Sequence, residues 1–209
     1  MSRRSFRYVT AWLGILLLVP TLSTVALSKT EATPQPTSLA GQFLVATPEM
    51  GDPNFRHAVI LMVRHDKTGA LGIIINRPIQ EVPLARLMDL VGKRSTGITG
   101  RAQVFAGGPV DPQIGFVVHT AEYHRSGTID IDGHVAMTSD PEALSDICNH
   151  KGPRQSLIAF GYAGWGPGQL ESEMMLGGWF TVPEDPKFVF DMDRDKLWDE
   201  MTKRRTYPL

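Results

Sequence analysis

Carboxylates and histidines are the side chains of this sequence best suited to acid–base or metal chemistry. Two carboxylates beside a histidine can act as general acid and base, or hold a divalent cation. The residues that could do so are Asp52, Glu171, Glu173, His57, His65 and His119. None of them lies in a P-loop, HExxH or nucleophile-elbow pattern, so these residues permit hydrolysis without indicating it.

The spacing of the histidines argues against a shared metal ion. His57 and His65 lie at the two ends of one apolar run. On a regular strand, which rises about 3.3 Å per residue, they would share a face but stand roughly 26 Å apart. They cannot bind one ion together unless the strand bends. We therefore predict no metal site, no cofactor and no complete catalytic set.

Arg77 is the charge with the most suggestive surroundings. It follows an apolar run, with Asn76 before it and Pro78 after it. A bidentate carboxylate partner such as Asp52 or Glu171 would satisfy its guanidinium. An ion pair that locks the strand end to a loop is favoured over an anion-binding role. Asn76 and Asp52 are each expected to cap a turn through their own side chains.

The segment from Gly161 to Glu173 combines many glycines with two large aromatic residues, Tyr162 and Trp165. Glycine is needed where the backbone takes positive φ or approaches another group closely, so we predict a loop leading to a helix. The aromatic rings are interpreted as packing against a sheet, or alternatively as the floor of a ligand site. The carboxylates at the helix start complement the helix dipole.

The strands that must position these residues follow from apolar runs and turn residues. The strongest signal is a hairpin of residues 57–65 and 71–76, whose continuously apolar runs flank a turn at 66–69. Continuous rather than alternating runs indicate that both faces are covered. Further strands are predicted at residues 42–46, 104–106, 114–120, 128–131, 156–160, 179–182 and 188–190.

Helices are predicted at residues 83–91, 139–150, 169–176 and 193–203. The first has apolar residues at i, i+3, i+4 and i+7 from Leu84, and Ser139 with Glu142 forms a capping box for the second. Hairpins mixed with helices, without regular βαβ alternation, indicate an α+β fold. We predict one domain with an antiparallel or mixed β-sheet core and three to four helices.

The start of the chain resembles an export signal. Three arginines precede a largely apolar run at residues 8–27, and such charges stay on the cytoplasmic side. Residues 1–28 are predicted to be a signal peptide or membrane anchor, and residues 29–40 a flexible linker rich in Pro, Thr and Ser. Residues 41–209 would then form a periplasmic or anchored domain, or a cytoplasmic one if the start is misassigned.

Charge and cysteine usage exclude two further classes. The whole chain carries −1 and residues 1–40 carry +3, which leaves −4 for the rest. A mildly acidic body makes nucleic acid an unlikely partner, since such binding calls for a basic face. The single cysteine, Cys148, excludes an internal disulfide and a cysteine-rich zinc site, and is expected in the core.

Five motifs together resemble the YqgE/AlgH family. They are Gly41–Pro48, Asp52–Phe55, Gly72–Pro78, Gly107–Val110 and Gly161–Glu171, in that order, within a resemblance that covers about residues 41–190. The resemblance implies a compact α+β domain of bacterial, generally cytosolic proteins with no established enzymatic activity. It also implies a role in transcriptional regulation that has been proposed for some members. The N-terminal leader departs from that pattern.

We predict a non-catalytic binding or regulatory module for an unknown small ligand or protein. The predicted site comprises Asp52, Asn76, Arg77, Gly107, Gly108, Tyr162, Trp165 and Glu171. The alternative is a hydrolase or nuclease-like enzyme that uses Asp52 and Glu171, with or without a metal. That alternative requires the two carboxylates to lie within roughly 4–6 Å, where each would shift the other's pKa. Enzymatic activity is left open and is the less favoured class.

Overall fold

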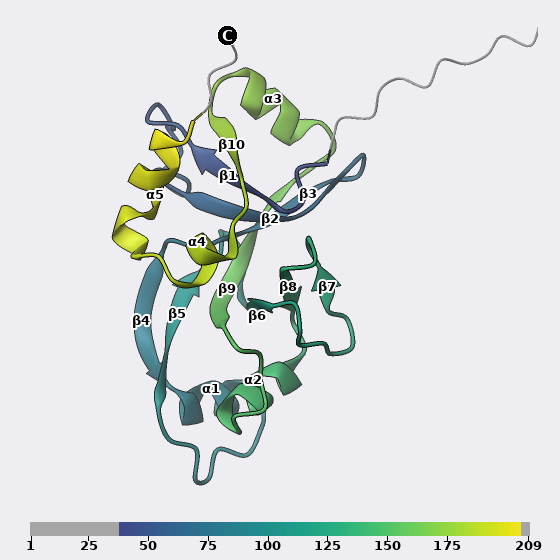
Figure 1. Cartoon of the computed structure of the whole chain (residues 1–209), viewed down its shortest axis with the longest axis vertical. Coiled ribbons are helices and arrows are strands. Elements are labelled where there is room, and N and C mark those ends of the chain that lie inside the picture. Colours follow the sequence, from purple (N-terminus) through teal and green to yellow (C-terminus); the bar gives the residue numbers. More distant parts are fainter. Residues whose placement is uncertain (1–37, 206–209) are drawn as a thin grey trace, which may run out of the picture. The chain divides into compact units, whose positions relative to one another are not determined.

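One long strand, β9 (Ser156–Trp165), belongs to two sheets in the computed structural model, which describes residues 38–205 (Figure 1). Its first half pairs with β5 (Arg101–Ala106) and β6 (Val110–Thr120). Its second half, Ala163–Trp165, pairs with β3 (Gly69–Ile74). Gly161 lies between the halves with φ +74°, a conformation that glycine adopts readily, so the strand can bend there.

The predicted loop after residue 160 is therefore wrong for its first five residues, which continue the strand. The turn that leads into the helix is confined to residues 166–168. The glycines were correctly taken to mark close backbone approach. However, they allow β9 to bend and to pass from one sheet to the other, because each sheet pairs with a different part of this strand.

The first sheet runs in the order β10–β1–β2–β3–β9 and is antiparallel throughout. In its register Phe43 lies opposite Val182 on one side and Leu61 on the other. The predicted hairpin is confirmed as β2 and β3. The bounds of the remaining strands of this sheet are Gln42–Ala46 for β1, Val59–Asp66 for β2 and Trp179–Pro183 for β10.

The second sheet contains the one parallel pair, β5 with β9, and otherwise antiparallel neighbours. Its remaining strands are β4 (Pro78–Pro83), β7 (Ile129–Asp130) and β8 (Val135–Thr138). The sequence did not predict β4 or β8. Pro78 begins β4 after ending the preceding strand, at an edge position where proline's missing N–H is tolerated.

Five helices cover the sheets in the described part of the chain. Their bounds are Leu84–Leu90 for α1, Pro141–Cys148 for α2, Gln169–Met175 for α3, Pro186–Phe190 for α4 and Arg194–Lys203 for α5. The predicted strand at 188–190 is wrong. Asp185 caps that segment and proline occupies its first turn, which together start a helix. Asp140, not Ser139, caps α2.

The α+β class is confirmed, with a larger sheet and one more helix than predicted. A core of fully buried residues, including Phe43, Leu61 and Ile73, lies between the sheets and α4 and α5. Burying each such side chain contributes about 1.5–3 kcal/mol. Cys148 is buried, as expected. Within residues 38–205 no helix is long and apolar enough to cross a membrane, and the predicted leader lies outside these residues.

Candidate functional site

The tryptophan of the glycine-rich segment is part of a closed aromatic cluster beneath α3. Glu173 Oε2 accepts hydrogen bonds from both indole N–H groups, at 3.0 Å from Trp165 and 2.8 Å from Trp179. Gln169 Nε2 donates to the other carboxylate oxygen at 2.9 Å. The Phe55 ring stacks on Trp165 and meets Trp179 edge-on. Trp165 is only 6% exposed, so it forms no open floor for a ligand.

The neighbouring carboxylate, Glu171, is paired with a histidine. Glu171 Oε1 lies 3.0 Å from His65 Nε2, and the other ring nitrogen of His65 accepts the Leu39 N–H at 3.1 Å. This acceptor role places the imidazole proton on Nε2, facing the carboxylate. The pKa of Glu171 is lowered, first by a hydrogen bond from the Glu171 backbone N–H and then by the hydrogen bond from His65. The pair ties the start of the described chain to β2, since Ser38 Oγ also donates to the His65 carbonyl.

Arg77 holds a loop through carbonyl oxygens, not through the predicted carboxylate partner. It donates to the Asn54 carbonyl and, at 2.9 Å, to the Arg56 carbonyl. Asp52 accepts the Asn54 backbone N–H at 2.8 Å, the turn-capping role expected of it. The strand end is therefore locked to the 52–57 loop, but by charge-assisted bonds to the backbone.

Asn76 fixes the other end of the same loop. Its Oδ1 accepts the Val59 N–H at 2.9 Å, and its Nδ2 donates to the His57 carbonyl at 2.8 Å. His57 has φ +56°, in the left-handed region that residues other than glycine adopt uncommonly. The Asn76 amide thus joins a strained turn to the start of β2.

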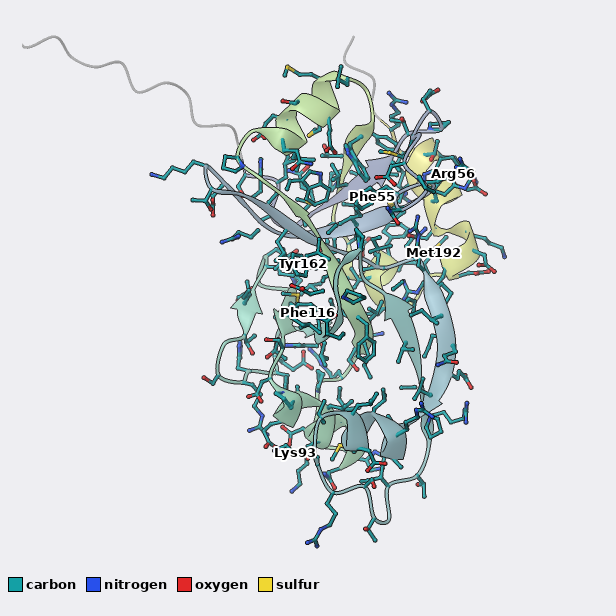
Figure 2. All side chains as sticks on the ribbon, turned by 180° about the vertical axis from the view of Figure 1, so that it is seen from behind. Phe55, Arg56, Lys93, Phe116, Tyr162 and Met192 are labelled. Atoms are coloured by element: carbon teal, nitrogen blue, oxygen red, sulfur yellow. The ribbon has the colours of Figure 1, made fainter. Side chains whose placement is uncertain are left out.

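Gly107 and Gly108 lie where the chain passes directly against β9. A Cβ at Gly108 would stand 2.0 Å from the Tyr162 carbonyl carbon, and one at Gly107 would stand 2.3 Å from the Gly161 oxygen. Both glycines are therefore required for backbone packing. The Tyr162 ring meets Phe116 edge-on at 6.1 Å (Figure 2).

The eight predicted site residues fall into three groups instead of one cavity. Asp52, Asn76 and Arg77 surround the 52–57 loop. Gly107, Gly108 and Tyr162 lie at the crossing over β9. Trp165 lies beneath α3, and Glu171 is in the first turn of α3 itself. Phe55 connects the first group to the third, because its ring enters the aromatic cluster while Arg77 holds the carbonyls on either side of it.

Asp52 and Glu171, the two carboxylates of the catalytic alternative, show no sign of interacting with each other. A like-charged neighbour raises a carboxyl pKa, whereas the pKa of Glu171 is lowered by its backbone and His65. Asp52 spends one oxygen on its own turn. Among residues 38–205 no group of three or more His, Cys, Asp or Glu side chains is placed to hold a metal ion.

An apolar cleft that the sequence did not predict opens between α1, α2 and β6. Its volume is about 180 Å³, and its walls include Phe116, Leu144 and Phe160. Leu90 is 65% exposed and Ile114 is 40% exposed at its edge. Leu90 carried the signal that could have revealed the cleft, because it lies outside the apolar stripe of its helix.

A polar hollow of about 390 Å³ lies in the other half of the molecule, beside α5. Arg56, Arg77 and Arg194 line it, together with Trp198. The sequence prediction included Arg77 here but missed Arg56, whose exposed side chain carries no motif signal. This hollow therefore combines a predicted residue with others that only the fold brings to it.

Comparison with known proteins identifies the family. Residues 43–209 match the family model described as AlgH-like. The chain belongs to the AlgH-like family. A UPF0301 protein of Jannaschia sp. is 42% identical over 163 residues, which cover 77% of this chain and 85% of that protein. One from Rhodospirillum rubrum is 40% identical over 153 residues, or 73% of this chain and 80% of the relative.

Solved structures agree with this AlgH-like assignment. The solution structure of the AlgH protein from Pseudomonas aeruginosa matches with a TM-score of 0.71 and 35% identity, over 83% of this chain and 92% of that one. A Corynebacterium diphtheriae protein shares the fold alone, with a TM-score of 0.61 and 22% identity, over 85% and 90% of the two chains. The resemblance inferred from the five motifs is thereby confirmed.

Proposed function

We propose that this AlgH-like protein is a non-catalytic binding module whose cleft between α1, α2 and β6 receives an apolar group of its ligand or partner. The observation that carries the proposal is exposed apolar surface at the edge of an open apolar cleft. Leu90, Val91 and Ile114 present their side chains to solvent at the edge of the cleft. Grouped apolar exposure of this kind is typical of interaction sites.

The size of the cleft suits one ring or one branched alkyl group. Its volume of about 180 Å³ is close to that of apolar cavities, about 150 Å³, which stay dry and bind benzene. Phe116, Leu144 and Phe160 give it apolar walls. Asp140 lies at the rim but already accepts the Glu142 N–H as a helix cap. The occupant is therefore selected by shape and apolar area, at about 25 cal/mol per Å² removed from water.

The polar residues of the family motifs, with Glu173 just after the last motif, support this proposal because they hold the fold together and do not form a catalytic set. Glu173 is engaged with two indoles, Glu171 with a histidine, and Arg77 with two carbonyls. A hydrolase would need at least one such group to be free and its pKa adjusted for proton transfer. No observation favours the carboxylate pair of Asp52 and Glu171 as a catalytic alternative.

Benzene titration of the ¹⁵N-labelled full chain tests the proposal by NMR. We expect saturable amide shifts confined to α1, α2 and β6. The double variant Leu90→Ser with Phe116→Ala should lose them, because one change removes the rim and the other a wall. Met175→Ser, at a position 82% exposed on α3, is the matched control and should leave the shifts unchanged.

Two outcomes would contradict the proposal. Shifts spread over both halves of the molecule would mean that benzene partitions onto any apolar surface. Unchanged binding by the double variant, provided that its amide spectrum remains folded, would place the probe outside the cleft.

A further inference from the structure

The polar hollow beside α5 concentrates three arginines around one solvent-filled space. Arg56, Arg77 and Arg194 all line it, and we call it the arginine hollow. It is lined by residues of the 52–57 loop and α5, whereas the apolar cleft is lined by residues of α1, α2 and β6. In Figure 1, α5 lies far from α1 and α2. The two sites are therefore independent, and the arginine hollow does not rest on the function proposed above.

Two of these arginines are partly withdrawn from water without a carboxylate partner. Arg77 donates to two carbonyls of the 52–57 loop, and Arg194 donates to the carbonyls of Phe188, Val189 and Phe190. Within residues 38–205 no carboxylate oxygen stands within 4.0 Å of either guanidinium. Burial lowers the pKa of both, offset in part by the more distant Asp52 and Asp191. Carbonyl dipoles compensate these charges only partly.

Arg56 is a third cation whose side chain is uncommitted. This side chain is exposed and makes no hydrogen bond or ion pair with another described residue. Its backbone is nevertheless fixed, because Arg77 holds its carbonyl at 2.9 Å. A guanidinium offers five N–H donors, so Arg56 keeps all of them and Arg77 keeps those not spent on the two carbonyls.

The walls of the arginine hollow are rigid. The His57 ring packs on the Trp198 ring with 4.2 Å between centroids, and Trp198 Nε1 donates to the Ala46 carbonyl at 2.8 Å. Asn76 Nδ2 also holds the turn at His57 by donating to the His57 carbonyl at 2.8 Å. The Arg77 guanidinium, held by its two carbonyl bonds, would lose little conformational entropy when a ligand binds.

Two carboxylates on α5, Asp195 and Asp199, oppose an anion in this hollow. Both are exposed and lie at its solvent side. Exposed charges in water interact weakly, whereas Arg77 and Arg194 are partly buried and therefore in a lower dielectric. Three guanidiniums against two carboxylates leave the lining with a net positive charge.

We propose that the arginine hollow is a binding site for a small oxyanion, namely a carboxylate or phosphate group of a ligand, held by Arg56 and Arg77. The planar fork of a guanidinium matches both groups through paired N–H bonds. His57 and Trp198 would flank the rest of such a ligand. The anion supplies the negative charge that Arg77 lacks among the described residues.

Titration of the full chain with sodium phosphate and, separately, with sodium acetate tests this site by NMR at constant ionic strength set with chloride. We expect saturable shifts of the amides of residues 54–57 and of the Trp198 indole. Saturation by phosphate alone identifies a phosphate site, saturation by acetate alone a carboxylate site, and saturation by both a general oxyanion site. Each of these three results supports the proposal.

Arg56→Gln should weaken binding about tenfold, the effect of losing one charge-assisted hydrogen bond. The variant should fold normally, since the Arg56 side chain bonds no other described residue. Arg64→Gln, at another exposed arginine on β2, is the matched control and should bind as the parent does. Equal weakening in both variants, or no saturation with either anion, would overturn the proposal.

Discussion

Beneath α3 the rings of Phe55, Trp165 and Trp179 enclose one another, whereas between α1 and α2 the side chains of Leu90 and Ile114 remain open to water. The first region carries the most conspicuous motif of the sequence, and the second carries none. In the first, a single carboxylate satisfies two indoles and the glycines permit backbone contact. In the second, ordinary aliphatic residues surround a small hollow.

The difference shows that a segment with an unusual sequence need not expose its side chains to a ligand. Close backbone crossings accept only glycine, and buried indoles need an acceptor, so a closed region demands particular residue types. An apolar cleft demands only apolar side chains of the right size. The following predictions test whether the first region is structural and the second is open for binding.

The largest expected effect is that of Gly161→Ala, at the bend of β9. An added Cβ would stand 2.5 Å from the Gly108 oxygen and 3.0 Å from the Val110 oxygen. Both are backbone atoms that cannot move without displacing the start of β6 and the turn before it from β9. We expect the free energy of unfolding, measured with urea, to fall by about 4 kcal/mol or more, or the variant not to fold.

Gly97→Ala is the matched control for that change. Gly97 has φ +81°, close to the +74° of Gly161, but an added Cβ would meet no atom within 4 Å. The free energy of unfolding of this variant should fall by only about 1–2 kcal/mol, the cost of the left-handed conformation for a residue with a Cβ. Equal losses in the two variants would show that φ strain alone governs position 161.

Glu173→Ala should lower the free energy of unfolding by about 2–4 kcal/mol. It leaves two buried indole N–H groups without their acceptor, and each unsatisfied group costs about 1–3 kcal/mol. Glu173→Gln keeps an acceptor oxygen and should lose about 1 kcal/mol. Urea unfolding followed by tryptophan fluorescence measures both, and a fully stable Glu173→Ala protein would contradict the assigned role of the carboxylate.

A pH effect on stability is expected from Glu184, which lies between β10 and α4. Burial raises the pKa of Glu184 from 4.5 to about 9, and the neighbouring Asp132 adds to the rise. The folded protein therefore keeps a proton that the unfolded chain releases, so this residue's contribution to stability is complete below pH 4.5 and lost as the pH rises towards 9. Glu184→Gln should flatten the fall of the melting temperature over that range. A profile identical to that of the parent would contradict the raised pKa.

The smallest effect on stability is expected from Leu90→Ser. Because this side chain is 65% exposed, the free energy of unfolding should change by no more than about 0.5 kcal/mol. Benzene binding should nevertheless weaken. A large loss of stability in the same urea assay would show that Leu90 belongs to the core, and the contrast between the two regions would fail.

Much of the fold was predictable from local patterns. Continuous apolar runs around a turn gave the hairpin of β2 and β3, and apolar periodicity gave α1. Errors arose where local signals had two meanings. Pro186 and Asp185 outweighed the apolar residues that suggested a strand at 188–190, and Gly161 served a bend within β9 rather than the end of a strand.

The candidate sites were less predictable, because their residues come from distant parts of the chain. The sequence supplied Arg77 and Asn76 but assigned Arg77 a carboxylate partner, since carbonyl oxygens leave no trace in a sequence. Nothing local connected Arg56 to Arg194, or Leu90 to Ile114. These neighbours are set by the packing of helices on the two sheets.

The sequence by itself determined the family, the α+β class and the residues that backbone crossings and buried indoles require. Those features depend on residue type, and residue type is what a sequence records. Only the tertiary structure decided that Glu173, Glu171 and Arg77 are engaged within the fold, and that an apolar cleft and an arginine hollow stay open. Such outcomes depend on which distant groups meet, and long-range packing settles that through distance and burial.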